Sequence, residues 1–283
     1  MADGRSRPPF YLRIRLWVQF AAAFLVNALF LYDLRFICVP VLNCWACPVG
    51  AFACPMGALQ SGASAMRGAL LLPFYALGSI LAFSAVMGRS MCGFLCPFGL
   101  VQDLMGKLRK RAASMPRAMG YLKYVLLIVL GIVLPYFTFV PWFCEFCPQG
   151  ALEGGIFQPL LDPELRPLIG GWWYLKIGIL VAFLVASIFV RRPFCHSFCA
   201  LGALFSLCNR VSLLRMRYVE EDCTDCMWCV QNCPAGIDPR TDLEGMNCIK
   251  CLECAKCPFG AIQVTNAFSC SSCGKPETED DAP

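Results

Sequence analysis

The sequence predicts an all-α bundle of four transmembrane helices, followed by a small α+β lobe that is dense in cysteine. Three observations predict it: 58% of the 283 residues are apolar, only 15% are charged, and 21 are cysteine. Soluble domains carry about 25% charged residues, so this balance favours a protein that lies in lipid. After residue 217 the chain becomes polar and short-looped, which marks the beginning of the lobe.

Four apolar stretches are each long enough to cross a bilayer as a helix, since a hydrocarbon core of about 30 Å takes roughly 20 residues. We expect these helices at 15–36, 69–88, 121–141 and 172–190. The domains that follow are a transmembrane domain at 1–217, a lobe at 218–273 and a disordered acidic tail at 274–283.

The charges between the stretches predict the orientation of the chain. Seven Lys or Arg residues and one acid, Asp103, lie in 89–123, whereas 142–171 contains Arg166 and four acids. Because segments rich in Lys and Arg stay in the cytoplasm, we expect a multi-pass protein of the cell (inner) membrane with both termini cytoplasmic. Segments 37–68 and 142–171 then face outward. The net charge of +5 is explained by lipid headgroups, and we expect no nucleic-acid partner.

The lobe carries two runs of closely spaced cysteines. They are Cys223-x2-Cys226-x2-Cys229-x3-Cys233-Pro and Cys248-x2-Cys251-x2-Cys254-x2-Cys257-Pro. The first run has the spacing of bacterial ferredoxins, in which the fourth cysteine crosses to the other [4Fe–4S] cluster. A zinc ribbon, the alternative, places two Cys-x2-Cys knuckles farther apart.

Crossed ligation gives two sets of cluster ligands in the lobe. The first set is Cys223, Cys226, Cys229 and Cys257, and the second set is Cys248, Cys251, Cys254 and Cys233. The second run is one residue short before Cys257, which puts that ligand and the first cluster in question. Two further cysteines, Cys270 and Cys273, have no clear partner.

The apolar part of the chain contains an internal repeat with a period of about 100 residues. Its outer motifs are Cys44-Trp-Ala-Cys47-Pro and Cys144-Glu-Phe-Cys147-Pro. Its inner motifs are Cys92-Gly-Phe-Leu-Cys96 and Cys195-His-Ser-Phe-Cys199. Two parallel-repeat hairpins, related by an axis along the membrane normal, would bring the members of each pair together.

Alternative roles stay open for these membrane cysteines. The inner four, Cys92, Cys96, Cys195 and Cys199, would hold a [4Fe–4S] cluster, or each pair would only brace its turn or the docked lobe. The outer four, Cys44, Cys47, Cys144 and Cys147, would hold another cluster or form disulfides in an oxidising compartment. Cys38 and Cys54 are further candidates for the outer group, as ligands or in disulfides. Cys54-Pro-Met-Gly-Ala also resembles the sequence around Cys147.

The helices, the Cys92-to-Gly99 motif, the Cys195-to-Leu204 motif and the trailing double run resemble the NapH/MauN family of membrane ferredoxins. They are also similar to the C-terminal half of NosR. The resemblance implies four helices with the ferredoxin domain in the cytoplasm, and a role in quinol oxidation and electron delivery to periplasmic reductases. The outward cysteine turns depart from NapH and suggest a conduit within a larger complex.

We therefore expect an iron–sulfur electron-transfer subunit of an oxidoreductase complex, linking a quinone pool or a cytoplasmic donor to an extracytoplasmic redox partner. That partner would be an iron–sulfur or cytochrome subunit, and quinol dehydrogenase is the activity to consider. The sequence offers no phosphate loop, no Ser/His/Asp arrangement and no carboxylate dyad, so we assign no catalytic residue. The alternatives are an accessory factor for maturing or repairing a metalloenzyme, and a structural anchor with outer disulfides.

Overall fold

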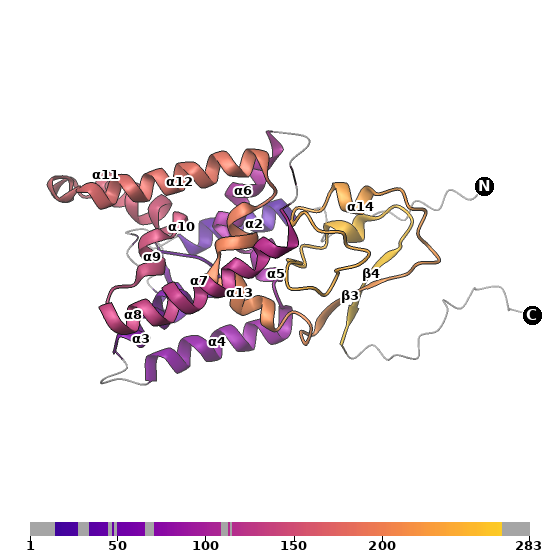
Figure 1. The fold of residues 1–283 in the computed structure, drawn as a ribbon, viewed down its shortest axis with the longest axis horizontal. Helices are drawn as coiled ribbons and strands as arrows, with labels where there is room; N and C mark the ends of the chain where they lie inside the picture. The colour runs from indigo at the N-terminus through magenta and orange to yellow at the C-terminus, as the bar shows by residue number, and fades with distance from the viewer. Residues whose placement is uncertain are drawn as a thin grey trace, which may run out of the picture.

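The helical bundle and the C-terminal lobe are two distinct parts of the chain, and the lobe packs against one end of the bundle (Figure 1). The computed structural model describes residues 15–27, 34–44, 47, 50–65, 71–108, 113 and 115–267. The expected tail at 274–283, Cys270 and Cys273 lie outside these residues.

Four apolar segments build the bundle. They are α2 (Arg15–Val26), α4 (Leu71–Met87), α12 (Gly171–Phe189) and a continuous segment of η1 (Arg117–Tyr121), α7 (Leu122–Ile128), η2 (Val129–Val133) and α8 (Leu134–Thr138). Two helices, Ala118–Thr138 and Gly171–Phe189, are long and apolar enough to cross a membrane, judged by length and composition. The apolar helices Arg15–Val26 and Phe74–Met87 are shorter.

The outward surface of these helices is apolar. Trp17 is 75% exposed, Phe74 62% and Phe137 73%, and α12 buries only Leu180 and Ser187. A helix that is apolar all round and presents those side chains outward is typical of a protein surrounded by lipid. The exposed surface therefore agrees with membrane association.

The first helix is shorter than the predicted range of 15–36. It ends at Val26, and Leu34–Cys38 forms β1, which pairs in parallel with β2 (Phe52–Ala53). The Asn43 side chain donates to the carbonyl oxygens of Val26 and Phe52, which ties this strand pair to the end of α2. Apolar composition alone does not distinguish a buried strand from a helix, which explains the difference.

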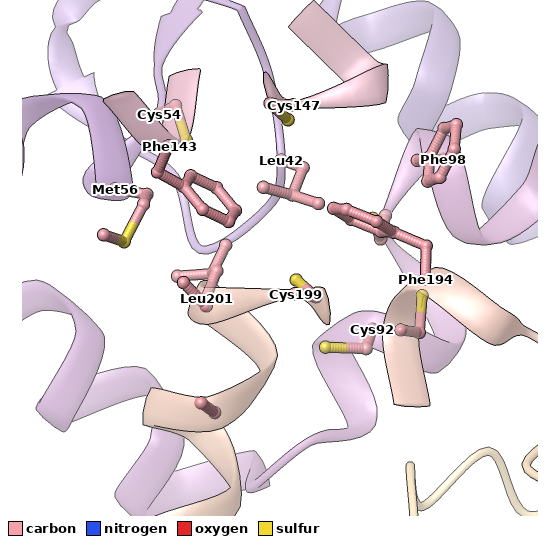
Figure 2. Packing of buried hydrophobic residues seen from close by; sticks show 14 of the residues in the cluster. Leu42, Cys54, Met56, Cys92, Phe98, Phe143, Cys147, Phe194, Cys199 and Leu201 are labelled. Carbon is pink, nitrogen blue, oxygen red and sulfur yellow. The ribbon is translucent and has the colours of Figure 1, made fainter. Parts of the chain in front are cut away.

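Shorter helices lie between these segments, and several of them carry the cysteine turns. In chain order they are α3 (Pro55–Ala65), α5 (Ser90–Phe94), α6 (Pro97–Lys107), α9 (Trp142–Phe146), α10 (Pro148–Gly150), η3 (Ala151–Ile156), α11 (Phe157–Leu161), η4 (Pro163–Leu168), η5 (Phe194–Phe198) and α13 (Ala200–Leu207). Cysteines of both predicted membrane groups belong to the same buried core as Phe98, Phe143 and Phe194 (Figure 2).

The lobe combines a two-stranded sheet with short helical turns, as an α+β lobe should. Strand β3 (Leu214–Tyr218) pairs antiparallel with β4 (Ile262–Asn266). Two short helices lie between these strands in the sequence. α14 (Trp228–Gln231) is within the first cysteine run, and η6 (Glu253–Lys256) is within the second. The predicted boundary at 217/218 falls within β3, so the lobe begins at Leu214 in the structure.

Candidate metal centres

The lobe contains a cavity lined by every cysteine of the first predicted set. These are Cys223, Cys226, Cys229 and Cys257. Cys226 is exposed, whereas Cys229 and Cys257 are buried. The short spacing before Cys257 therefore does not keep this residue from the other three, because the chain turns at η6.

A second cavity in the lobe is lined by every cysteine of the second predicted set. These are Cys233, Cys248, Cys251 and Cys254, all of them buried. Each cavity thus combines three cysteines of one run with the last cysteine of the other. This crossing is the arrangement that two-cluster ferredoxins use.

The backbone of the two runs repeats a rare conformation at equivalent positions. Asp225 and Met227 have φ of 51° and 57°, and Lys250 and Leu252 have φ of 42° and 60°. Left-handed residues are uncommon without glycine and form concave sites in which successive N–H groups face an anion. The lobe therefore fits two anionic clusters in two ways: its cysteines supply the thiolates, and its backbone can supply N–H groups.

The four predicted inner cysteines line one cavity inside the bundle. They are Cys92, Cys96, Cys195 and Cys199, and all are buried. Two groups donate to their sulfur atoms: Gln102 Nε2 lies 3.1 Å from Cys195 Sγ, and Gly202 N lies 3.2 Å from Cys199 Sγ. Donors of this kind stabilise a ligating sulfur. The two hairpins thus bring their inner motifs together, as the repeat predicts.

Four cysteines of the bundle precede a helix in the same way. The carbonyl oxygens of Cys54, Cys96, Cys147 and Cys199 each accept a hydrogen bond from the N–H four residues later, at 3.0–3.2 Å. Cys96, Cys147 and Cys199 also share φ near −72° and ψ of 107–120°. The helix after Cys199 begins with Ala200, where the other three begin with proline, and it still has the same geometry. The cysteine before a helix in the first outer segment is Cys54 rather than Cys47.

The outer cysteines line a much larger cavity of about 970 Å³. Those on its wall are Cys38, Cys44, Cys54, Cys144 and Cys147. Cys47, which the sequence placed in this group, does not line the cavity, and its Sγ lies 3.4 Å from the carbonyl oxygen of Glu153. The resemblance of Cys54-Pro-Met-Gly to the Cys147 motif was the sequence signal for this exchange.

Leu42 separates the inner and the outer cavity. It lines both of them, and Figure 2 shows it between Cys147 and Cys199. Gly93 provides the corresponding contact toward the lobe: a Cβ atom there would lie 3.1 Å from Cα of Cys251. The second lobe group, the inner group and the outer group therefore follow one another from the lobe through the bundle.

Burial makes these thiols hard to ionise without a metal. It raises the pKa of Cys248 and of Cys147 to about 12, and that of Cys251 to about 11. Iron binds the thiolate form, so a bound cluster would supply the positive charge that the apolar surroundings lack. Burial also raises the pKa of Glu153, beside the outer group, to about 7.

Cavities lined by four cysteines could hold either a cluster or a single ion. Among the described residues, no group of three or more His, Cys, Asp or Glu would hold one metal ion. A zinc ion takes its ligands at about 2.3 Å and would draw four sulfurs close together. A [4Fe–4S] cluster distributes its four thiolates over four irons. A cavity lined by four cysteines supplies one thiolate for each iron of such a cluster. Within the same described part, no disulfide joins two cysteines.

The sequence model for the "4Fe-4S binding domain" family matches residues 69–116, 123–166 and 172–217. Each matched segment contains one cysteine pair of the bundle. The chain is 31% identical over 200 residues to an uncharacterized protein of Methanocaldococcus jannaschii, covering 67% of this chain and 77% of that protein. The chain belongs to the NapH/MauN family of ferredoxin-type proteins.

Two named members show how far the similarity extends. Ferredoxin-type protein NapH of Haemophilus influenzae is 26% identical over 63% of this chain and 61% of its own length. Methylamine utilization ferredoxin-type protein MauN of Methylorubrum extorquens is 28% identical over 60% of this chain and 57% of its own length. This chain therefore spans less than two thirds of each. Regulatory protein NosR of Pseudomonas aeruginosa also matches, over 25% of its length. No solved structure matches the chain significantly.

Proposed function

We propose that this iron–sulfur protein carries electrons across a membrane, between a donor at its lobe and a redox partner at its outer end. The observation that supports this most directly is the order of three cysteine groups: the second lobe group, the inner group and the outer group. Gly93 packs on Cys251, and Leu42 lines both bundle cavities. Because electron tunnelling falls steeply with distance, closely spaced centres are what such a route requires.

The proposed ligands are sixteen of the seventeen cysteines that line the four cavities, Cys38 of the outer cavity being left out. The lobe sets are Cys223, Cys226, Cys229 and Cys257, and Cys233, Cys248, Cys251 and Cys254. The bundle sets are Cys92, Cys96, Cys195 and Cys199, and Cys44, Cys54, Cys144 and Cys147. When bound, iron–sulfur clusters accept and release single electrons. The chain then has to hold, space and shield them.

We propose a multi-pass orientation in an inner membrane with the lobe in the cytoplasm. Arg89, Arg191 and Arg192 lie where the bundle meets the lobe. Glu145 and Glu153 lie at the opposite, outer cavity. Cationic residues remain on the cytoplasmic side of membrane helices. The partners in this arrangement are further redox subunits, one of them extracytoplasmic.

We further propose that the outer cavity takes a quinone. Its volume of about 970 Å³ is in the range of small-molecule sites, roughly 300–1,000 Å³. Trp172, Trp173 and Phe143 supply an aromatic wall, and Lys176 supplies a cation. A quinol that is oxidised there would release two electrons and two protons, and the electrons would leave one at a time. Such a quinol would be an electron donor at the outer end, in place of a donor at the lobe.

Tryptophan fluorescence tests the quinone site directly. Menadione should quench the fluorescence of the purified protein, and Trp173→Phe together with Trp172→Phe should remove most of the saturable part. Trp17→Phe is the control, because Trp17 lies on α2 outside the cavity. Equal saturable quenching in the double variant would contradict a quinone in this cavity.

Transfer across the membrane is tested in liposomes that contain ferricyanide inside and receive dithionite outside, with protein-free vesicles as the blank. Protein oriented with its lobe outward should bleach the ferricyanide, and Cys199→Ala should slow bleaching at least tenfold. Cys208→Ala is the matched control, because Cys208 lines none of the four cavities. Transfer at the wild-type rate in Cys199→Ala would overturn the conduit and leave the maturation role.

A further inference from the structure

Two buried cations meet at the junction of bundle and lobe. Arg89 and Lys123 are both 0% exposed. Arg89 Nη1 donates to the carbonyl oxygen of Met246 at 2.5 Å, and Lys123 Nζ donates to the same oxygen at 3.0 Å. Two like charges that converge on one carbonyl in a dry site repel each other. Arg89 does not lose its proton in proteins, so its buried charge needs a negative partner.

No carboxylate supplies that partner within the described residues. None of their ion pairs includes Arg89 or Lys123. The other guanidinium groups buried nearby have carboxylate partners: Arg192 pairs with Asp103, and Arg15 pairs with Asp103 and Glu253. A buried charge without a counter-charge is strongly unfavourable. The imbalance at Arg89 and Lys123 thus points to an anion that binds beside them.

Arg89 lies on the wall of the inner cavity together with the four cysteines. Its Nη2 donates to the carbonyl oxygen of Cys195 at 2.9 Å, and its Nε is buried without a hydrogen-bond partner. A Cβ atom at Gly202 would lie 3.2 Å from Arg89 Nη2 and 3.5 Å from Cys199 Sγ. The Arg89 guanidinium and the Cys199 thiol therefore both lie next to Gly202 on the wall of the inner cavity.

We infer that Arg89, assisted by Lys123, is a positioning residue that raises the reduction potential of the cluster at the inner cysteines. A cluster held by four thiolates is anionic and gains one more negative charge on reduction. A fixed cation beside it favours the reduced form, and burial strengthens the effect. The same side chain joins Cys195 to Met246, two residues before Cys248, so it also fixes the lobe against the inner centre.

The inference rests on the proposed function, because it takes a cluster at the inner cysteines. Cys199→Ala identifies the paramagnetic signal of that cluster and should remove about four irons. If Cys199→Ala loses neither iron nor signal, the proposed function fails. If that signal exists and does not respond to Arg89, only the present inference fails.

The test is a redox titration of the anaerobically purified full chain, followed by paramagnetic resonance with iron counted in each variant. Arg89→Gln should keep its iron, and the ratio of reduced to oxidised inner cluster at a fixed potential should fall at least tenfold, or about 59 mV. Arg89→Lys retains the charge and should stay within threefold of the wild type. An unchanged midpoint in Arg89→Gln overturns the inference.

Arg191→Gln is the matched control. Arg191 also donates to lobe carbonyls, those of Val230, Gln231 and Cys233, but it does not line the inner cavity. Its loss should leave the inner midpoint unchanged. If Arg89→Gln fails to assemble the inner cluster, Lys123→Met takes its place: a lower inner midpoint supports the inference, and an unchanged one overturns it.

Discussion

Gly93 lies so close to Cys251 that a methyl group at position 93 would come within 3.1 Å of both Cα and Cβ of Cys251. Gly93 follows Cys92 directly, so this contact joins the inner cysteine group to the second group of the lobe. Arg15 Nε and Gln19 Nε2 both donate to the carbonyl oxygen of Gly93, at 3.1 and 2.7 Å. α2 therefore holds this glycine against the lobe.

A larger side chain at this contact should separate the two cysteine groups. We expect Gly93→Val to cost about 1–3 kcal/mol of stability, as overpacking does, and to slow electron transfer from lobe to bundle while total iron is kept. Stopped-flow reduction followed at the lobe and inner signals measures this. Gly78→Ala is the control, because a Cβ atom at Gly78 meets nothing within 4 Å. Unaltered transfer in Gly93→Val would show that the spacing is not critical.

The outer group gives a prediction that separates two neighbouring cysteines. Cys54 lines the outer cavity and Cys47 does not, so Cys54→Ala should lower the iron content by about four atoms per chain. Cys47→Ala should retain its iron. Iron and sulfide analysis of anaerobically purified protein measures both, with about sixteen irons expected in the wild type. The reverse result would restore the set derived from sequence spacing.

Asp103 should be essential for attaching the lobe to the bundle. Its carboxylate pairs with Arg192 at 2.6 Å and with Arg15 at 2.5 Å, and Arg15 in turn pairs with Glu253 of the lobe. Removing one partner from a buried network costs about 3–5 kcal/mol. We therefore expect Asp103→Asn to lower the melting temperature and to expose the lobe to limited proteolysis.

The control for Asp103 is Asp225→Asn. Asp225 pairs with Arg240, but its side chain is 80% exposed. An exposed pair of this kind contributes about 1 kcal/mol or less. Equal destabilisation by the two substitutions would argue against a structural role for the buried network.

The pH dependence of this network follows from the direction of the shift. Burial alone would raise the pKa of Asp103, but the guanidinium groups of Arg192 and Arg15 hold it below its usual range. An unfolded aspartate titrates near pH 3.9, so the stabilisation is fully present above that pH and is lost as pH falls through the lower folded value. The difference in melting temperature between wild type and Asp103→Asn should stay constant from pH 8 to 5. A difference that shrinks within this range would show that the carboxylate is already taking up protons.

The grouping of the lobe cysteines could be predicted because it depends on local spacing. Cys223, Cys226 and Cys229 lie close together in the sequence. Cys257 joins them in the folded lobe, although the second run has one residue fewer before it than the first run has before Cys233. The inner group was expected from the repeat, and its four cysteines line one cavity. The predictions of the lobe groups and of the inner group both depend on short segments, whose geometry is determined by the residues within them.

The N-terminal part of the bundle was harder to predict because distant contacts determine it. β1 pairs with β2 across the loop that contains Cys44, and Cys44 N–H donates to Glu153 Oε2 at 2.6 Å, 109 residues away. In the structure α2 ends at Val26, and Cys47 does not line the outer cavity, although Cys44-x2-Cys47-Pro copies Cys144-x2-Cys147-Pro. Arg89 and Lys123 gave no spacing signal at all, because their partner is a backbone carbonyl of the lobe.

Leu42 has an energetic consequence in the proposed orientation. The inner and outer cavities lie on opposite sides of this one side chain, so an electron that passes it travels along the membrane normal. Such a charge does work in the transmembrane voltage, about 2.3 kcal/mol for a full crossing at 100 mV. A negative cell interior would speed export of electrons through this protein and oppose their import.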